Sequence, residues 1–208
     1  MEKTDLRKAL KLFYEPSARD FAVVDVPEMA FLMIDGAGDP NVSPVYANAV
    51  QWLYGVSYAL KFASKADGRD YGVLPLEGLW WADDMDDFIS ANKAKWKWTM
   101  MIAQPDWITP DMLATAIERT KAKLGEPPAT LRLERFAEGL SVQIMHLGPY
   151  AAEGPTIARL HSEFLPANGL AENGHHHEIY LSDPRRVAPE KLKTVIRQPV
   201  RRVRDQTS

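Results

Sequence analysis

The sequence predicts an α+β fold built from two successive β-α-β-β modules. Residues 44–64 place apolar side chains at helical spacing, while the segments on either side read as extended strands. The same order of strand, helix and two strands recurs after about residue 130. We therefore expect a duplicated fold with antiparallel sheets and with the helices on one face.

Turn-forming and capping residues mark the ends of the first strand and the start of the first helix. The stretch FAVVDVPEMAFLMIDGAGDP reads as extended segments broken by Pro27 and closed by a glycine turn. Ser43 is suited to cap a helix, and Pro44 is suited to its first position. The apolar spacing that follows predicts a helix from Pro44 to about Ser64.

Two further strands are expected in the first module. Residues 71–81 form an apolar run in which Pro75 indicates a sheet edge or a bulge. Residues 95–103 alternate between Lys or Thr on one side and Trp or Met on the other, which is typical of a strand. The acidic segment between them, residues 82–93, is expected to be a connector with room for one helical turn.

The second module follows a linking helix at about residues 109–124, which Thr109 and Pro110 begin and Gly125 ends. We treat residues 1–208 as a single domain, with a first half at about 20–105 and a second half at about 130–203. The expected elements of the second half are strands at 130–136 and 140–148 around a turn at 137–139, a helix at 157–164, and strands at 176–182 and 193–203.

The composition excludes several classes of protein. There is no cysteine, so neither disulfides nor thiolate chemistry are available, and the net charge of −3 gives no reason to expect a nucleic-acid or anionic-membrane partner. No apolar stretch approaches the ~18 residues of a membrane span, and the charged N-terminus does not read as a signal peptide. We expect a cytoplasmic protein.

Two glutamates in otherwise apolar strands are the leading candidates for chemistry. Glu77 lies in LPLEGLWW and Glu178 lies in HHHEIYLSD, at equivalent places in the two modules. A carboxylate removed from water costs several kcal/mol or shifts its pKa unless it has a partner, and a cationic ligand or a polarised water would serve as one. The alternatives are that Glu178 faces solvent and that Glu77 pairs with a lysine at a sheet edge.

The histidine run HHH is a weak candidate for a metal site. Consecutive residues of a strand alternate between faces, so only His175 and His177 could share a metal. No carboxylate stands at ligand spacing, and the sequence contains no phosphate-binding or dinucleotide-binding motif. We expect neither a metal nor another cofactor.

The chain resembles a known family. SVQIMHLGPY followed by HHEIYLSDP resembles the second half of the GyrI-like small-molecule-binding domains, and LFYEP, MIDGAGDPN, VQWLYGVSYALKF and PLEGLWW resemble a standalone branch of them. Some members of that branch hydrolyse the cyclopropane of DNA-alkylating cyclopropanoid antibiotics. The resemblance implies modules related by a pseudo-two-fold axis, with a groove between the halves that binds flat, often cationic, organic molecules.

The resemblance also implies roles for particular residues. Glu178 matches the binding glutamate of multidrug-sensing transcription factors with this fold. We expect no transcription factor here, because about twenty residues before the first strand are too few for a DNA-binding module. The expected catalytic residues are Glu77, Glu178 and Tyr150. The expected ligand-binding residues are Tyr14, Trp80, Trp81, Trp98, Met145 and Tyr180.

The aromatic candidates each have an ordinary alternative. Indole faces can sandwich a planar ligand or meet a cation, and tyrosine hydroxyls can donate to a ligand carbonyl or to the glutamates. We expect Trp81 and Trp98 to line the groove. The alternative for any one tryptophan is core packing, and for Tyr14, Tyr150 and Tyr180 it is a buried ring with a solvated hydroxyl.

Two functions remain open at this point. In the first, one glutamate acts as general base on water and the other orients that water, so that the protein hydrolyses and detoxifies cyclopropanoid compounds. In the second, the protein only binds or sequesters drug-like molecules. An association with gyrase inhibition is a third and weaker hypothesis. The expected partner is a small hydrophobic or aromatic molecule, with no direct nucleic-acid or membrane contact, bound by a monomer or a weak homodimer.

Overall fold

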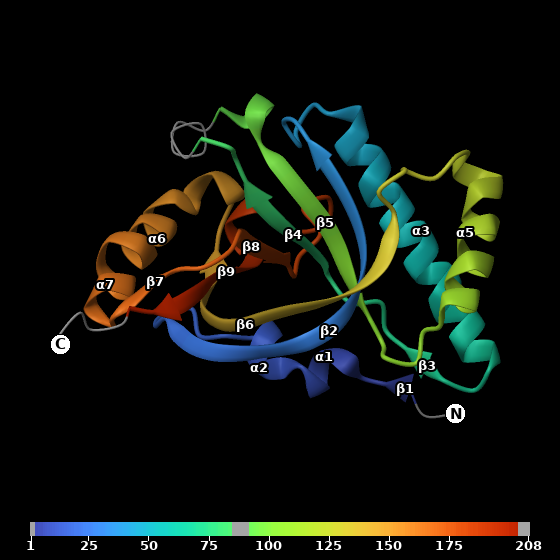
Figure 1. The fold of residues 1–208 in the computed structure, drawn as a ribbon, viewed down its shortest axis with the longest axis horizontal. Coiled ribbons are helices and arrows are strands. Elements are labelled where there is room, and N and C mark those ends of the chain that lie inside the picture. The colour runs from blue at the N-terminus through green and yellow to red at the C-terminus, as the bar shows by residue number, and fades with distance from the viewer. Residues whose placement is uncertain (1–2, 85–91, 204–208) are drawn as a thin grey trace. The chain divides into compact units, whose positions relative to one another are not determined.

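The computed structural model describes residues 3–84 and 92–203 and divides into two compact units (Figure 1). Unit 1 comprises Met1–Leu10 and Glu28–Phe136, and unit 2 comprises Lys11–Pro27 and Ala137–Ser208. The helical turn considered for the acidic connector falls largely on residues 85–91, which lie outside the described residues. Within the described part of the chain, no helix has the length and apolarity needed to cross a membrane.

Unit 1 contains an antiparallel sheet with the strand order β2-β5-β4. Strand β2 begins among the residues of unit 2 and belongs to unit 1 from Glu28 onward. The predicted strand at 71–81 is split, because the extended pairing stops between β3 and β4, around Pro75. The elements are β1 (Lys3–Thr4), α1 (Leu6–Ala9), β2 (Ala22–Ala37), β3 (Asp70–Tyr71), β4 (Leu76–Trp81), η1 (Lys93–Lys95) and β5 (Lys97–Gln104).

Two helices, α3 (Pro44–Ala66) and α5 (Pro110–Leu124), pack side by side in unit 1 (Figure 1). The predicted caps are confirmed. The Ser43 hydroxyl accepts a hydrogen bond from the Tyr46 backbone N–H at 3.3 Å, and the Thr109 hydroxyl accepts one from Met112 at 3.3 Å. Because these caps satisfy backbone donors that the helix cannot pair internally, they fix where each helix begins.

The face of the unit 1 sheet that α3 covers is identified by Trp98. The Trp98 ring lies edge-on to the ring of Tyr46 on α3, with centroids 5.3 Å apart, and Trp98 is fully buried. Across the strand pair, Gly36 leaves room for the indole, since a Cβ at Gly36 would lie 2.2 Å from Trp98 Cη2. The glycine is therefore required by close packing between β2 and β5.

Unit 2 repeats the topology of unit 1. Strand β9 pairs antiparallel with β6 on one edge and with β8 and β7 on the other, so that β6, β9 and β8 correspond to β2, β5 and β4. The predicted α+β class with antiparallel sheets is confirmed. The remaining elements are α2 (Lys11–Tyr14), β6 (Arg132–Leu147), η2 (Tyr150–Ala152), β7 (Leu170–Glu172), β8 (His176–Tyr180), η4 (Pro189–Lys191) and β9 (Lys193–Arg202).

Strand β6 differs from the prediction of two strands around a turn at 137–139. It runs unbroken from Arg132 to Leu147 and passes from unit 1 into unit 2 at Ala137. Gly139 has φ +71°, a conformation that other residues rarely adopt, and it lies inside the strand. The glycine therefore acts as a local distortion of a continuous strand, as glycines do at β-bulges.

The helix of unit 2 contains a π-helical turn. The chain is helical through α6 (Gly154–Arg159), the π turn η3 (Leu160–Phe164) and α7 (Leu165–Ala167). Leu160 and Leu165 both join the core cluster with Val142 and Val200. The two leucines are five positions apart in the sequence. A regular α-helix would rotate them away from each other, whereas an i to i+5 turn aligns them. The longer turn thus keeps both leucines in the core.

We expect Gly36→Ala to lower the free energy of unfolding by about 1–3 kcal/mol, because the added methyl group displaces a buried indole. Urea denaturation followed by tryptophan fluorescence measures this. Gly154→Ala is the matched control, since a Cβ there meets nothing within 4 Å and Gly154 has no positive φ. Equal stability of G36A and wild type would contradict the close packing of Trp98.

Candidate functional site

Strand β8 places the polar side chains of a candidate site on one face of unit 2. The register pairs Glu178 with Ile196 and Tyr180 with Thr194 on β9, and His176, Glu178 and Tyr180 share that face because they alternate with His177 and Ile179. The same face is packed by η3 and α7, because Leu160 and Leu165 form a core cluster with Val142 and Val200. The sequence-based pairing of Glu178 with Tyr180 on one face agrees with this register.

Glu178 is held by several hydrogen bonds. The Tyr180 hydroxyl donates to Glu178 Oε2 at 2.8 Å, and His176 Nε2 lies 3.3 Å from Glu178 Oε1. The Glu178 side chain is 16% exposed and that of His176 is 6% exposed. Burial alone would raise the pKa of Glu178, but hydrogen bonds from His176, Tyr180 and Glu153 outweigh it and lower the pKa. The site therefore stabilises an ionised, largely buried carboxylate.

Glu153 is a member of this site that the sequence analysis missed. It precedes α6, is 4% exposed, and makes no side-chain capping bond to the helix. Its carboxyl group is hydrogen-bonded to Glu178 instead. Two carboxyl groups bonded to each other need one proton between them. The site therefore brings a second buried carboxyl group against Glu178.

Tyr150 approaches the same site from η2. Its ring lies edge-on to the ring of Tyr180, with centroids 5.5 Å apart and an interplanar angle of 78°. Tyr150 is 38% exposed, so the residue is only partly covered. The predicted residues Tyr150, Glu178 and Tyr180 therefore lie together in unit 2. Their roles in ligand binding and catalysis stay predictions.

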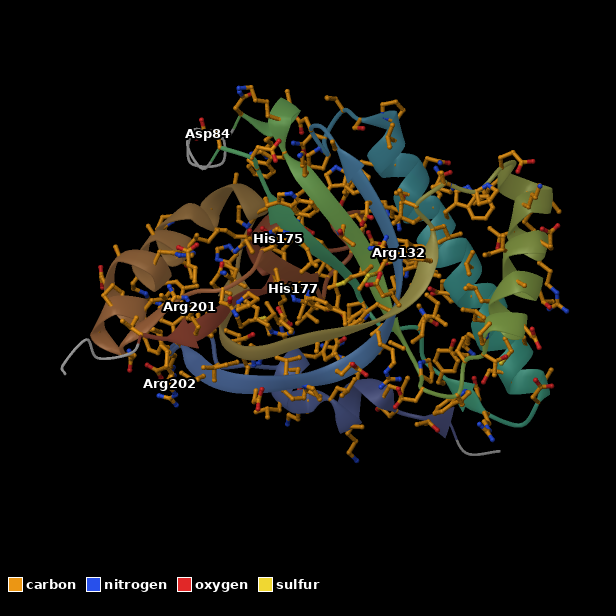
Figure 2. The ribbon with its side chains drawn as sticks, in the orientation of Figure 1. Asp84, Arg132, His175, His177, Arg201 and Arg202 are labelled. Atoms are coloured by element: carbon orange, nitrogen blue, oxygen red, sulfur yellow. The ribbon has the colours of Figure 1, made fainter. Side chains whose placement is uncertain are left out.

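The opposite face of β8 carries a second buried charge cluster. His177 Nδ1 lies 2.8 Å from Glu138 Oε1, and Arg197 donates from Nη1 to Glu138 Oε2 at 2.8 Å. The three side chains are at most 2% exposed (His177 is labelled in Figure 2). Burial would raise the pKa of Glu138, but the charges and hydrogen bonds of His177 and Arg197 lower it to about 2.

Glu77 lies in unit 1 and is fully buried. It pairs in register with Met101 on β5, on the face of the sheet that α3 does not cover. That face carries an apolar cluster formed by Phe31, Met33, Leu74, Leu79, Met101 and Ala103, with Trp81 packed against it. A carboxylate here is costly to bury, which makes Glu77 a candidate for function. That Glu77 acts together with Glu178 stays a prediction.

The three tryptophans predicted to bind a ligand lie on different faces of the unit 1 sheet. Trp80 and Trp98 face α3, where the ring of Tyr46 contacts both, and each is at most 4% exposed. Trp81 is on the same face as Glu77 and is only partly buried. Because successive strand residues alternate, Trp81 is the one of the three on the Glu77 face, four residues further along β4.

Tyr14 and Met145 are the two predicted ligand-binding residues of unit 2 that lie outside β8. Tyr14 ends α2 and is 1% exposed. Met145 pairs with Val195, so its side chain is on the opposite face from Glu178. It contributes to a cavity of about 270 Å³, lined by Ala18, Ile144, Met145, His146, Leu147, Thr156 and Arg159.

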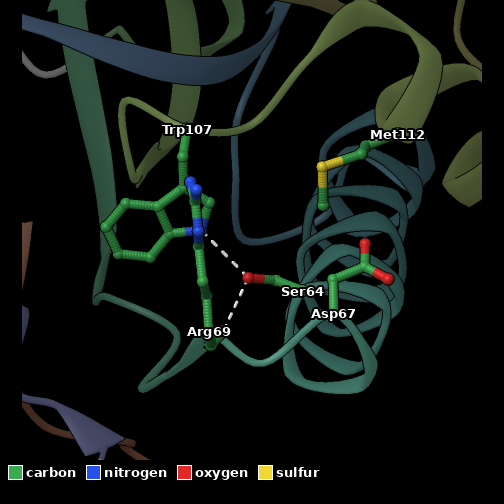
Figure 3. Close-up of a pocket in the computed structure, with 5 residues that line it drawn as sticks. All are labelled: Ser64, Asp67, Arg69, Trp107 and Met112. Atoms are coloured by element: carbon green, nitrogen blue, oxygen red, sulfur yellow. Dashed lines mark hydrogen bonds between the residues drawn. The ribbon is translucent and has the colours of Figure 1, made fainter.

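A second cavity, of about 210 Å³, lies in unit 1 at the end of α3 (Figure 3). It is lined by Ser64, Asp67, Arg69, Trp107 and Met112. The Ser64 hydroxyl accepts from Trp107 Nε1 at 2.9 Å and donates to the Arg69 carbonyl at 2.6 Å. These bonds tie the helix end to the loop after it, and none of the predicted site residues takes part.

Within residues 3–84 and 92–203, no three His, Asp or Glu side chains are arranged to hold a metal ion. In the run His175–His177, two of the imidazoles are directed to different carboxylates. His176 turns to Glu178 and His177 turns to Glu138, on opposite faces of β8. Each of these two imidazoles is therefore engaged with a different carboxylate.

Comparisons with known proteins agree with this architecture. The family model for the GyrI-like small molecule binding domain matches residues 19–201. An uncharacterised conserved protein from Listeria innocua has 41% identity and a TM-score of 0.85, covering 95% of this chain and 99% of its own. A structure described as a hydrolase from Listeria innocua has 41% identity and a TM-score of 0.81 over the same shares. No match was found among curated protein sequences.

A more distant structure shares the fold alone. The EcmrR C-terminal domain has 14% identity and a TM-score of 0.56, covering 88% of this chain and 98% of its own.

We expect Glu138→Gln to lower the free energy of unfolding by about 3–5 kcal/mol at neutral pH, since it removes the counter-charge of buried Arg197. The wild type holds this stabilisation above the ordinary carboxylate pKa of 4.5 and loses it as the pH falls toward 2. A pKa lowered from 4.5 to about 2 corresponds to about 3 kcal/mol. The difference between wild type and variant should therefore shrink across that window.

Urea denaturation at a series of pH values measures this difference. Asp183→Asn is the control, because the pKa of Asp183 is also lowered to about 2 by its bonds to Arg185, but its side chain is 30% exposed and solvent screens it. A stability gap for E138Q that stays constant from pH 7 to pH 2 would contradict the assigned ionisation.

Proposed function

Because the chain belongs to the GyrI-like small-molecule-binding family, we propose that it binds a flat hydrophobic or cationic molecule and hydrolyses it. The proposed substrates are genotoxic compounds of the cyclopropanoid type, so that the protein detoxifies them in the cytoplasm. The Listeria innocua structure described as a hydrolase supports a hydrolytic reaction, as does the resemblance to the branch that contains cyclopropanoid hydrolases.

The observation that carries the proposal is the environment of Glu178. An ionised carboxylate, largely buried, is oriented by Tyr180 and His176 and stands beside a second carboxyl group, Glu153. A base for water must keep its proton-accepting form at neutral pH and a fixed direction. The lowered pKa supplies the first property, and the hydrogen bonds supply the second.

The proposed reaction adds one water to a cyclopropane conjugated with a carbonyl group. The water oxygen bonds to a ring methylene carbon as one ring C–C bond breaks. The electron pair of that bond passes to the carbonyl oxygen, which accepts a hydrogen bond from the Tyr150 hydroxyl and ends as a hydroxyl with a proton from solvent. Glu178 takes the proton that the water loses. Opening a strained ring of this kind needs positioning and base catalysis rather than a cofactor.

The second candidate function is binding without turnover, as in a drug-sequestering module. The T-shaped pair of Tyr150 and Tyr180 beside a carboxylate would also suit an aromatic cation that is only held. In that case Glu178 supplies a counter-charge, and the substrate leaves unchanged. Product formation separates the two functions.

We expect Glu178→Gln to lower hydrolysis by about 10²-fold or more, because the amide cannot accept the proton of the attacking water. Mass spectrometry of a cyclopropanoid alkylator incubated with the protein measures this as a product heavier by one water. Glu77→Gln should lower turnover as well if the second glutamate takes part. Glu190→Gln, on an exposed glutamate of unit 2, is the matched control and should retain wild-type turnover.

The binding function predicts a different outcome. There, no hydrated product forms even with the wild type, and E178Q weakens cationic ligands by about 1–3 kcal/mol while neutral ligands bind as before. Wild-type turnover and binding in both E178Q and E77Q would refute both candidate functions for these residues.

We expect Tyr180→Phe to move the acidic limb of the pH–rate profile to higher pH. The Tyr180 hydroxyl is one of the donors that lower the pKa of Glu178, so its loss raises that pKa and the base is protonated sooner on acidification. Rates measured from pH 3 to pH 8 test this. Tyr58→Phe, on an exposed tyrosine of α3, should leave the profile unchanged, and an unshifted limb in Y180F would argue against Glu178 as the base.

A further inference from the structure

A row of buried polar side chains crosses three strands of unit 2 on the face opposite Glu178. Arg197 on β9 pairs in register with Gln143 on β6 and with His177 on β8. Its Nε donates to Gln143 Oε1 at 3.0 Å, and its Nη1 donates to Glu138 Oε2 at 2.8 Å. Arg197 and Gln143 are each 1% exposed. The row is thus a continuous hydrogen-bonded unit inside the protein.

The same row binds a segment far away in the sequence. Arg197 Nη2 donates to the Phe13 carbonyl at 2.6 Å, and Gln143 Nε2 donates to the Leu12 carbonyl at 2.7 Å. The helix α2 is one turn long, so the carbonyls of its later residues, such as Leu12 and Phe13, have no following turn to pair with. The two side chains supply those partners, and the Met145 backbone N–H adds a bond to the Ser17 carbonyl at 2.9 Å.

Stability alone gives a poor account of this arrangement. Removing charged groups from water is costly, and apolar side chains of similar volume often fill such a place equally well or better. An apolar row would pack against α2 but would leave its carbonyls without donors and its position along the sheet loosely defined. The planar guanidinium, by contrast, reaches three acceptors in fixed directions.

The residues that the row contacts stand next to predicted site residues. Arg197 binds the carbonyl of Phe13, which precedes Tyr14, and Glu138 binds the side chain of His177, which precedes Glu178. One buried network therefore bonds to the chain next to two residues that we expect to contact a ligand, Tyr14 and Glu178.

We infer that Arg197, Gln143 and Glu138 are positioning residues that hold segment 11–17, with Tyr14, and strand β8, with Glu178, in the geometry for ligand binding. The link to ligand binding rests on the proposed function. The hold on segment 11–17 is independent of it and is measured without a ligand.

Hydrogen–deuterium exchange followed by mass spectrometry tests the hold on segment 11–17. Arg197→Lys keeps the positive charge near Glu138, but a single ammonium group does not reproduce the three directed bonds. We expect amides in 11–17 to exchange about 10-fold faster or more, because the segment opens locally without global unfolding. Gln143→Met, which removes the bond to Leu12, should give a smaller increase, and it keeps the test decisive if R197K does not fold.

Two control variants separate positioning from general loss of stability. Leu160→Ala weakens the core of unit 2 on the other face of the sheet, and Arg201→Gln changes an exposed arginine on the same strand as Arg197 (Figure 2). We expect neither to speed exchange in 11–17 selectively. Unchanged exchange in both R197K and Q143M would overturn the inference, as would an equal acceleration in L160A at a matched melting temperature.

A second experiment tests the link to ligand binding. It measures, by fluorescence, the dissociation constant of 9-aminoacridine, a planar aromatic cation. We expect R197K and Q143M to weaken binding, and L160A and R201Q to bind as the wild type does. If R197K and Q143M speed exchange selectively in 11–17 but bind 9-aminoacridine as tightly as the wild type, the link to ligand binding is overturned. The positioning of the segment would still be supported. Absence of binding by the wild type would count against the proposed function, and the exchange result would still decide the hold on segment 11–17.

Discussion

The register between β8 and β9 is the constraint on which the chemistry of unit 2 depends. With His177 opposite Arg197, Glu178 and Tyr180 lie on the face that the helix packs against, and His177 points to Glu138. A slip by one residue would exchange the two faces, so that Glu178 and Tyr180 would lie on the side of Glu138 and the imidazole of His177 would lie on the side of Tyr150. The ion pairs of Glu138 oppose that slip, because they form in one register only.

The two units differ in the surroundings of their buried glutamates. In unit 2, Glu138 is compensated by Arg197 and His177, and Glu178 is compensated by hydroxyl, imidazole and carboxyl groups. In unit 1, Glu77 stands on a sheet face made largely of apolar residues. The sheet face opposite the helices thus carries buried ion pairs in unit 2 and mainly apolar side chains in unit 1, so the two repeats differ in the character of that face.

The helices could be predicted from local signals. The course of the strands and the environment of the candidate site depend on partners distant in the sequence, so these could be predicted only in part. Capping at Ser43 and Thr109 depends on neighbouring residues, so the starts of α3 and α5 followed from the sequence. Gly139 reads equally well as a turn or as a distortion within a strand, and only the partner strands decide. Alternation grouped Glu178 with Tyr180, but it does not tell which sheet face a helix covers, which decided the environments of Trp81 and Trp98. Glu138 was missed because its partners lie 39 and 59 residues away.

The π turn at Leu160–Phe164 has the form of a one-residue insertion into a helix. Each residue of an α-helix advances the chain by about 1.5 Å and rotates it by about 100°. Five residues of a π turn and four residues of an α-helix both bring the chain back to about the same side of the helix axis, so loss of one residue there would restore a regular helix with its core leucines still aligned. Glu153, which lies upstream of Leu160 in the chain, would then keep its place relative to Leu160. Length variation among relatives at this point would thus be tolerated both by the core and by the carboxyl group that meets Glu178, so evolution could add or remove a residue in this helix without altering the site on β8.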